Sequence, residues 1–114
     1  MGATTKPERY ANIAQKLLMD KGYNVYPINP NYEYIENAAC SPSIKDVKDK
    51  IDTVTVYMNP KKLESILSEI ISIKPKRIIL NPGSESEAVK DTLNSHGIAV
   101  MEACTLVLLK TGQF

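Results

Sequence analysis

The sequence lacks tryptophan and has one phenylalanine, one histidine and only two cysteines. Cys40 and Cys104 stand far apart in no metal-type spacing, and no histidine cluster accompanies them, so we expect a reduced, cytoplasmic setting and no bound metal. His96 comes just before Gly97, at the end of a predicted helix. An imidazole there is expected to be a partner of the helix dipole or a plain surface group rather than a catalytic base.

Long apolar runs and a charge excess are missing as well. No apolar run approaches the roughly 20 residues that span a bilayer, and the first residues do not have the pattern of a secretion signal. Fourteen basic and thirteen acidic side chains leave a net charge of +1. The six tyrosines are scattered and form no stacking platform. We therefore expect neither a nucleic acid nor a membrane as partner, and any bound anion needs a local site.

What the sequence does contain is an ordinary globular composition. The chain has 114 residues, of which 43% are hydrophobic and 24% charged, so we expect one domain over residues 1–114. An apolar stripe at helical spacing predicts a helix over 7–20. Thr5 and Glu8 have the spacing of a capping box at its start, and Lys21-Gly22 is a typical helix end.

Strand-like and helix-like segments alternate along the rest of the chain. Strands are predicted at 23–29, 52–58, 76–80 and 98–101. Helices are predicted at 43–51, 61–73 and 84–96, the first capped by Ser43 and the last by a Ser84–Glu87 capping box. A loose stretch covers 34–41, and a last apolar segment covers 105–110. This alternation predicts an α/β fold of the Rossmann-like type, a three-layer sandwich with a parallel sheet and helices on both faces.

In such a sheet, ligands bind at the turns that follow the strands. Here these turns read "GATTKPER", "INPNYE", "YMNPKK" and "LNPGSE". The first offers a glycine for close approach, the hydroxyls of Thr4 and Thr5, and the cations Lys6 and Arg9, which suits a phosphate or diphosphate. The three Asn-Pro pairs also have a purely structural explanation, because proline stops a strand and asparagine tolerates a tight turn.

A nicotinamide or flavin dinucleotide is disfavoured by two features. The G-x-G-x-x-G spacing is absent, because Gly2 is the only glycine of the first turn. Asn29-Pro30 stands where an acidic residue would hold the ribose hydroxyls.

The segments "GATTKPERYAN", "VYPINPNYE", "DTVTVYMNP", "RIILNPGSESE" and "EACTLVLL" resemble the small stand-alone CoA-binding proteins. These are Rossmann-type domains related to the CoA-binding domain of the succinyl-CoA synthetase α subunit. The resemblance implies that CoA binds with its diphosphate along residues 2–5, its adenosine end at 29–30, its adenine at 57–60 and its pantetheine arm at 81–83. It also implies that Arg9, and after it Lys6, is the cation that binds a phosphate. The implied ligand-binding residues are Gly2, Ala3, Thr4, Thr5, Lys6, Arg9, Asn29, Pro30, Tyr57, Met58, Asn59, Pro60, Asn81, Pro82 and Gly83; no catalytic residue is implied.

The family resemblance also implies a central strand before the Gly2 turn, where this sequence has only Met1. With strand order 3-2-1-4-5, that strand would join the strands at Val25 and Ile78. We expect either that Met1 is the last residue of such a strand in a longer chain, or that "TLVLLK" or a neighbouring chain takes its place.

The sequence thus predicts a cytoplasmic protein that binds CoA or an acyl-CoA and senses, carries or protects it rather than converting it. Two alternatives stay open: a nucleotide-dependent enzyme of the NAD(P) type, and an interaction or assembly domain with a degenerate ligand site. Which acyl group is bound, and whether a homodimer forms, also stay open.

Overall fold

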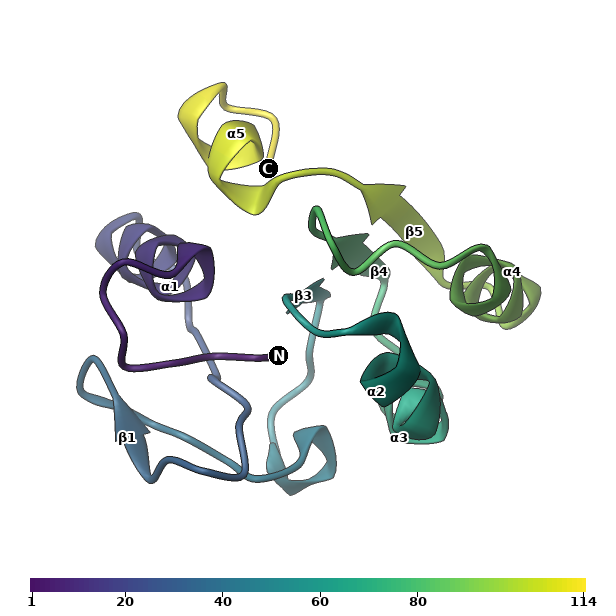
Figure 1. Ribbon diagram of the computed structural model, residues 1–114, viewed down its shortest axis with the longest axis horizontal. Coiled ribbons are helices and arrows are strands. Elements are labelled where there is room, and N and C mark those ends of the chain that lie inside the picture. The colour runs from purple at the N-terminus through teal and green to yellow at the C-terminus, as the bar shows by residue number, and fades with distance from the viewer.

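A three-stranded parallel sheet lies at the centre of the molecule (Figure 1). The computed structural model describes residues 1–114. Strands β3 (Thr53–Val56), β4 (Arg77–Leu80) and β5 (Ala99–Glu102) pair in the order β3-β4-β5, with Val54 opposite Ile78 and Ile78 opposite Val100. Each connection between them contains helix, as parallel pairing requires. The predicted α/β, Rossmann-like fold is confirmed.

Helices cover both faces of this sheet (Figure 1). Helices α1 (Tyr10–Asp20) and α5 (Thr105–Lys110) lie against each other on one face. Helices α2 (Pro60–Ser65), α3 (Leu67–Ile73) and α4 (Glu87–Ser95) lie on the other. None of these helices combines the length and the apolar character that a bilayer-spanning segment needs. The main core cluster consists of Ile28, Ile44, Val54, Val56, Leu63, Ile70, Ile78, Leu80, Val89, Leu93 and Ile98.

The first helix starts later than the sequence pattern predicts. Arg9 is the N-cap of α1 and no side chain caps this end, so the predicted Thr5–Glu8 capping box is wrong. The reason is a turn ahead of the helix, in which the Arg9 N–H donates to the carbonyl oxygen of Lys6 at 3.2 Å. The predicted end at Lys21-Gly22 is confirmed, with Gly22 at φ +88°.

The predicted helix over 61–73 is divided into α2 and α3 at Ile66, which leaves helical geometry with φ −114°. Asn59 caps α2 with its side-chain oxygen, which accepts the Lys61 N–H at 2.8 Å, and Pro60 occupies the first turn. This Asn-Pro pair therefore has the ordinary structural role of a helix start.

Helix α4 is capped by Ser86 and not by Ser84 as the sequence pattern predicts. Ser84 is buried, and its hydroxyl accepts the Met58 N–H at 2.9 Å and donates to the Val56 carbonyl oxygen at 3.2 Å. It joins the ends of β3 and β4, a role set by contacts distant in sequence.

Residues 23–29, predicted as a strand, form no ladder and make a single bridge between Ile28 and Ser41. The stretch predicted as loose contains a hairpin of β1 (Tyr34–Ile35) and β2 (Ala38–Ala39). The predicted cap at Ser43 is confirmed, but the helix after it is only the short 3₁₀-helix η1 (Ile44–Asp46).

Met1 lies between residues 23–28 and β3. Its amino group donates to the Thr55 carbonyl oxygen at 2.7 Å, and its own carbonyl oxygen accepts the Tyr57 N–H at 3.0 Å. The next residue, Gly2, donates to the Ile28 carbonyl oxygen at 3.2 Å. The expected order is therefore wrong in one respect, since the position before the Gly2 turn adjoins β3 and not β4. The "TLVLLK" segment is helix α5 and does not lie there.

The amino group of Met1 makes the stability of the 114-residue chain sensitive to pH. Burial lowers the pKa of this group from 8.0 to about 6. Between these values the unfolded chain binds more protons than the folded one, so stability falls as the pH drops from 8 to 6. We expect a loss of the order of 1–3 kcal/mol.

Denaturation midpoints at pH 6, 7 and 8 measure this effect, with the N-terminally acetylated chain as control. Acetylation removes the titrating group and should flatten the profile. Equal pH slopes for the two chains would contradict the assignment.

Candidate ligand site

A pocket of about 390 Å³ lies at the carboxyl edge of the sheet, where the turns after Met1, β3 and β4 meet. We call it the edge pocket. Its lining consists of Gly2, Thr4, Lys6, Arg9, Tyr10, Ala11, Tyr32, Tyr57, Met58, Pro82, Gly83 and Ser84. Eight of the residues implied by the family resemblance are in this set: Gly2, Thr4, Lys6, Arg9, Tyr57, Met58, Pro82 and Gly83.

The first wall of the edge pocket is the turn that follows Met1. Gly2 has φ +83°, a conformation that favours glycine, and a Cβ atom there would lie 2.3 Å from the carbonyl oxygen of Tyr57. Asn29 stabilises the turn, because its side-chain amide donates to the Ala3 carbonyl oxygen at 2.7 Å. The turn is thus held against both neighbouring segments, and its backbone has one defined path.

Two cations stand on this turn, together with the Thr4 hydroxyl, which contacts Tyr32 of another segment. The side chains of Lys6 and Arg9 are exposed and belong to none of the three ion pairs of the chain. The Thr4 and Tyr32 hydroxyls are hydrogen-bonded at 3.2 Å, and this contact with Thr4 lowers the pKa of Tyr32. Because no carboxylate neutralises them, Lys6 and Arg9 are available to an anion.

The second wall comes from the ends of β3 and β4. Burial raises the pKa of Tyr57 to about 12, so this phenol stays protonated at neutral pH. Its hydroxyl and that of Thr105 are buried without a hydrogen-bond partner. Gly83 has φ +95° and open space on the side where a Cβ atom would stand. An extended ligand can therefore approach the backbone closely at this wall.

The other implied residues lie outside the lining of the edge pocket. Asn59 and Pro60 start α2, and Asn29 supports the first turn. Asn81 is fully buried and bonded to Val56 and Thr105. The remaining three are Ala3, which is buried, and the exposed Thr5 and Pro30.

Four pocket residues are absent from the set that the resemblance implies: Tyr10, Ala11, Tyr32 and Ser84. Tyr10 has the spacing of a core position, but the side chain is 70% exposed, because α1 begins only at this residue. Tyr32 follows an Asn-Pro turn, and only its contact with Thr4 shows its place. A tyrosine near a turn is too common for its sequence position to have identified it.

A doubly wound sheet with a glycine turn, unpaired cations and hydroxyls at its carboxyl edge defines a Rossmann-like domain, in which this edge is the usual place of the ligand. The comparison with known families is more specific. The family described as "CoA binding domain" matches residues 1–110, and the chain belongs to this family.

Several known proteins are similar over most of the chain. A solved structure of a hypothetical protein from Pyrococcus horikoshii OT3 is 31% identical, with a TM-score of 0.92, over 96% of this chain and 78% of that one. The uncharacterized protein YneT of Bacillus subtilis is 23% identical over 94% of this chain and 80% of its own length.

A much longer relative is the acetate–CoA ligase [ADP-forming] II of Archaeoglobus fulgidus. It is 27% identical over 88% of this chain, but the matched region is only 16% of the ligase. This chain therefore corresponds to one part of that enzyme, and the similarity extends to a domain and not to the ligase as a whole.

Proposed function

We propose that the protein binds CoA or an acyl-CoA in the edge pocket. The observation that carries the proposal is the pair of exposed cations, Lys6 and Arg9, which lack acidic partners and stand beside the Gly2 turn in the same pocket. Phosphate oxygens are the natural partners of such groups. Membership of the CoA-binding domain family supports CoA as the phosphate-bearing ligand.

The binding mode follows from the two walls of the edge pocket. The diphosphate would lie along the Gly2 turn, held by the Thr4 hydroxyl and by Arg9 and Lys6. The open backbone at Gly83 would lie beside another part of the same extended ligand. The chain 1–114 would act as one binding domain.

We further propose that the protein senses, carries or protects CoA in the cytoplasm rather than converting it. The residues that line the edge pocket include hydroxyls and cations, but no carboxylate, imidazole or thiol. His96 is exposed at the end of α4, and Cys104 precedes α5. A nucleophile paired with a base, which group transfer generally needs, has no candidate there.

Thermal melting with CoA, acetyl-CoA, NAD, NADP and ATP, together with mass analysis of any copurifying ligand, tests the proposal. A shift specific to CoA or acetyl-CoA supports it. A shift with NAD or NADP alone would favour a dinucleotide site instead. The absence of any shift with all five would favour an interaction domain.

Replacing Arg9 by alanine should weaken CoA binding about 10- to 100-fold, because one charge-assisted phosphate contact contributes roughly 1–3 kcal/mol. Titration calorimetry measures the change. Arg9 is exposed, and its side chain neither caps α1 nor belongs to an ion pair, so the melting temperature without ligand should stay the same.

Lys21→Ala is the matched control, since it removes an exposed cation at the opposite end of the same helix. It should leave CoA affinity unchanged. If Arg9→Ala and Lys21→Ala bind CoA equally well, Arg9 is not a phosphate ligand.

A further inference from the structure

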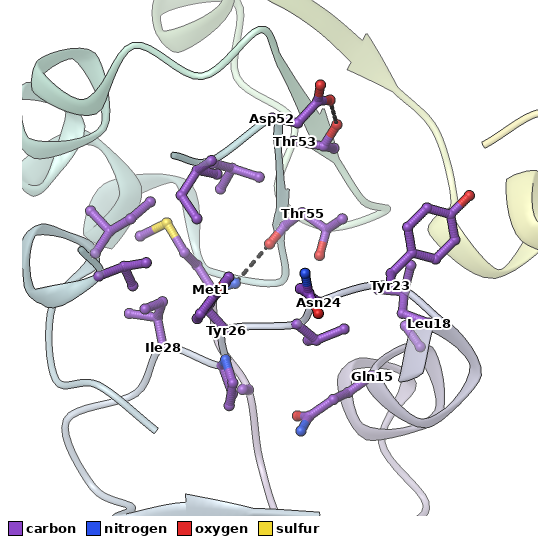
Figure 2. Close-up of a pocket in the computed structure, with 18 of the residues that line it drawn as sticks. Met1, Gln15, Leu18, Tyr23, Asn24, Tyr26, Ile28, Asp52, Thr53 and Thr55 are labelled. Carbon is purple, nitrogen blue, oxygen red and sulfur yellow. Dashed lines mark hydrogen bonds between the residues drawn. The ribbon is translucent and has the colours of Figure 1, made fainter. Parts of the chain in front are cut away.

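Two cavities of this chain differ in the groups that line them. The larger, with a volume of about 800 Å³, lies between residues 23–28 and β3 and is lined mostly by hydrophobic residues (Figure 2). Two of its polar groups are already bonded, since the Met1 amino group donates to the Thr55 carbonyl oxygen and the Thr53 hydroxyl donates to Asp52, both at 2.7 Å (Figure 2). In the lining of the edge pocket, hydrophobic residues are the minority, and two hydroxyls there contact each other.

These two hydroxyls belong to a short row of hydrogen bonds that crosses from the first turn to a separate segment. The Lys6 N–H donates to the Thr4 hydroxyl oxygen at 3.3 Å, and the Thr4 hydroxyl lies 3.2 Å from the hydroxyl of Tyr32. Each hydroxyl has a single hydrogen to donate. One of the two therefore donates to the other, and the second keeps its hydrogen for a ligand in the edge pocket.

The free hydrogen belongs to Tyr32 when all bonds of the row run in one direction. Thr4 already accepts the Lys6 N–H, and a hydroxyl that accepts one hydrogen bond donates the next one more strongly. The bond with Thr4 lowers the pKa of Tyr32, and Thr5 and the charge of Lys6 act in the same direction. Thr4 thus stabilises negative charge on the Tyr32 oxygen, as a donor does. It leaves a more acidic phenol, whose O–H is the stronger donor to an anion.

The surroundings of Tyr32 suit a negatively charged partner. Lys6 and Arg9 line the same pocket, and both side chains are exposed and outside the three ion pairs. None of the residues that line the pocket carries a carboxylate. A hydrogen bond from a hydroxyl to a phosphate oxygen is charge-assisted and stronger than one between neutral groups. The Tyr32 hydroxyl therefore lies where a phosphate oxygen is its best partner.

A purely structural role would make the Tyr32 hydroxyl a tie between the first turn and the segment to which Tyr32 belongs. Two other side chains already provide this tie. Asn29 bonds the turn at 2.7 Å, and the Asn12 amide donates to the Thr4 carbonyl oxygen at 2.9 Å and to the Glu36 carboxylate at 3.3 Å. The turn therefore keeps its place without the phenol hydroxyl.

We propose that Tyr32 is a ligand-binding residue of the edge pocket, whose hydroxyl donates directly to a phosphate oxygen while the Thr4 hydroxyl donates to Tyr32. This inference rests on the proposed binding of CoA and refines one part of it, because the Thr4 hydroxyl then acts on the diphosphate through Tyr32. The donors follow one another from the Lys6 N–H to Thr4, from Thr4 to Tyr32 and from Tyr32 to the phosphate.

Titration calorimetry with CoA on Tyr32→Phe, Thr4→Val and the double variant tests this order. Tyr32→Phe removes the last donor and should weaken CoA binding about 10-fold or more. Thr4→Val should weaken binding less, and adding it to Tyr32→Phe should cause no further loss. The control Tyr34→Phe changes a tyrosine that is 66% exposed and lies outside the pocket lining, so its affinity should be unchanged. Melting temperatures without ligand should stay the same in all four variants.

Equal CoA affinities of Tyr32→Phe and Tyr34→Phe would overturn the proposal and leave CoA binding itself intact. Losses that multiply in the double variant would show that Thr4 and Tyr32 bond the ligand independently, which would overturn the proposed order.

The same titrations with inorganic pyrophosphate separate this proposal from the proposed function. If the unchanged chain binds pyrophosphate but not CoA, the CoA proposal fails, and the Tyr32 variants are judged on pyrophosphate. If it binds CoA alone, the CoA titrations decide. If it binds neither, both proposals are overturned.

Discussion

Replacing Gly2 by alanine is expected to destabilise the 114-residue chain by roughly 2–6 kcal/mol. Two costs combine. The backbone at Gly2 has φ +83°, which an L-residue adopts only under strain, and the new Cβ atom would lie 2.3 Å from the carbonyl oxygen and 2.9 Å from the carbonyl carbon of Tyr57. Backbone atoms at the end of β3 cannot move aside as a flexible side chain would, so the turn itself must shift.

Gly22→Ala separates the two costs. Gly22 has nearly the same backbone conformation, φ +88°, but nothing lies within 4 Å of the position of its Cβ atom. This control should lose only the strain of a left-handed residue, about 1–2 kcal/mol. Urea denaturation of both variants measures the difference.

Equal losses for the Gly2 and Gly22 variants would show that Gly2 is not in close contact with Tyr57. A second readout is CoA affinity under conditions in which both variants are folded. A shifted Gly2 turn would move Thr4 away from Tyr32 and the proposed diphosphate position, so the Gly2 variant should bind CoA more weakly than the Gly22 variant.

The central strands could be predicted from the sequence because their signal is local. The segment at 76–80 ends in three successive apolar residues, 78 to 80, and all three are fully buried, as expected for a parallel strand covered on both faces. The segment at 23–29 also contains several β-forming residues, but it forms no ladder, because a strand needs a neighbour as well as suitable residues. Local composition can predict an extended segment but not its partner.

Helix starts show the same limit on a smaller scale. Ser84 and Ser86 both have the residue type of an N-cap, and Glu87 stands three residues after Ser84. Ser84 is hydrogen-bonded to Val56 and Met58, which are distant in sequence, so Ser86 and not Ser84 caps α4.

The edge pocket could be predicted in outline for a related reason. Turns after parallel strands must meet at one edge, whereas the direction of each side chain depends on contacts distant in sequence.

Asn81 illustrates this difference, and its replacement is the second large effect that we expect. Its side chain is fully buried at the end of β4, donates to the Val56 carbonyl oxygen at 3.0 Å and accepts the Thr105 N–H at 2.8 Å. Asn81→Ala leaves that buried N–H without a partner and opens a small cavity, so we expect a loss of about 2–4 kcal/mol. The control Asn59→Ala, at an exposed helix cap, should lose about 1 kcal/mol.

Asn81→Asp distinguishes lost hydrogen bonds from lost volume, because aspartate has nearly the same shape. An ionised carboxylate still accepts from Thr105 but faces the Val56 carbonyl oxygen without a proton to donate. Only the protonated acid can make both bonds, so burial and this contact should raise the pKa of the new carboxyl group. A raised pKa means that the folded state binds the proton more tightly, and the stability of the Asp variant relative to the unchanged chain should therefore improve as the pH falls from 7 to 5. A stability difference that is the same at both pH values would show that the donor to Val56 is dispensable, and that Asn81 acts there through its volume.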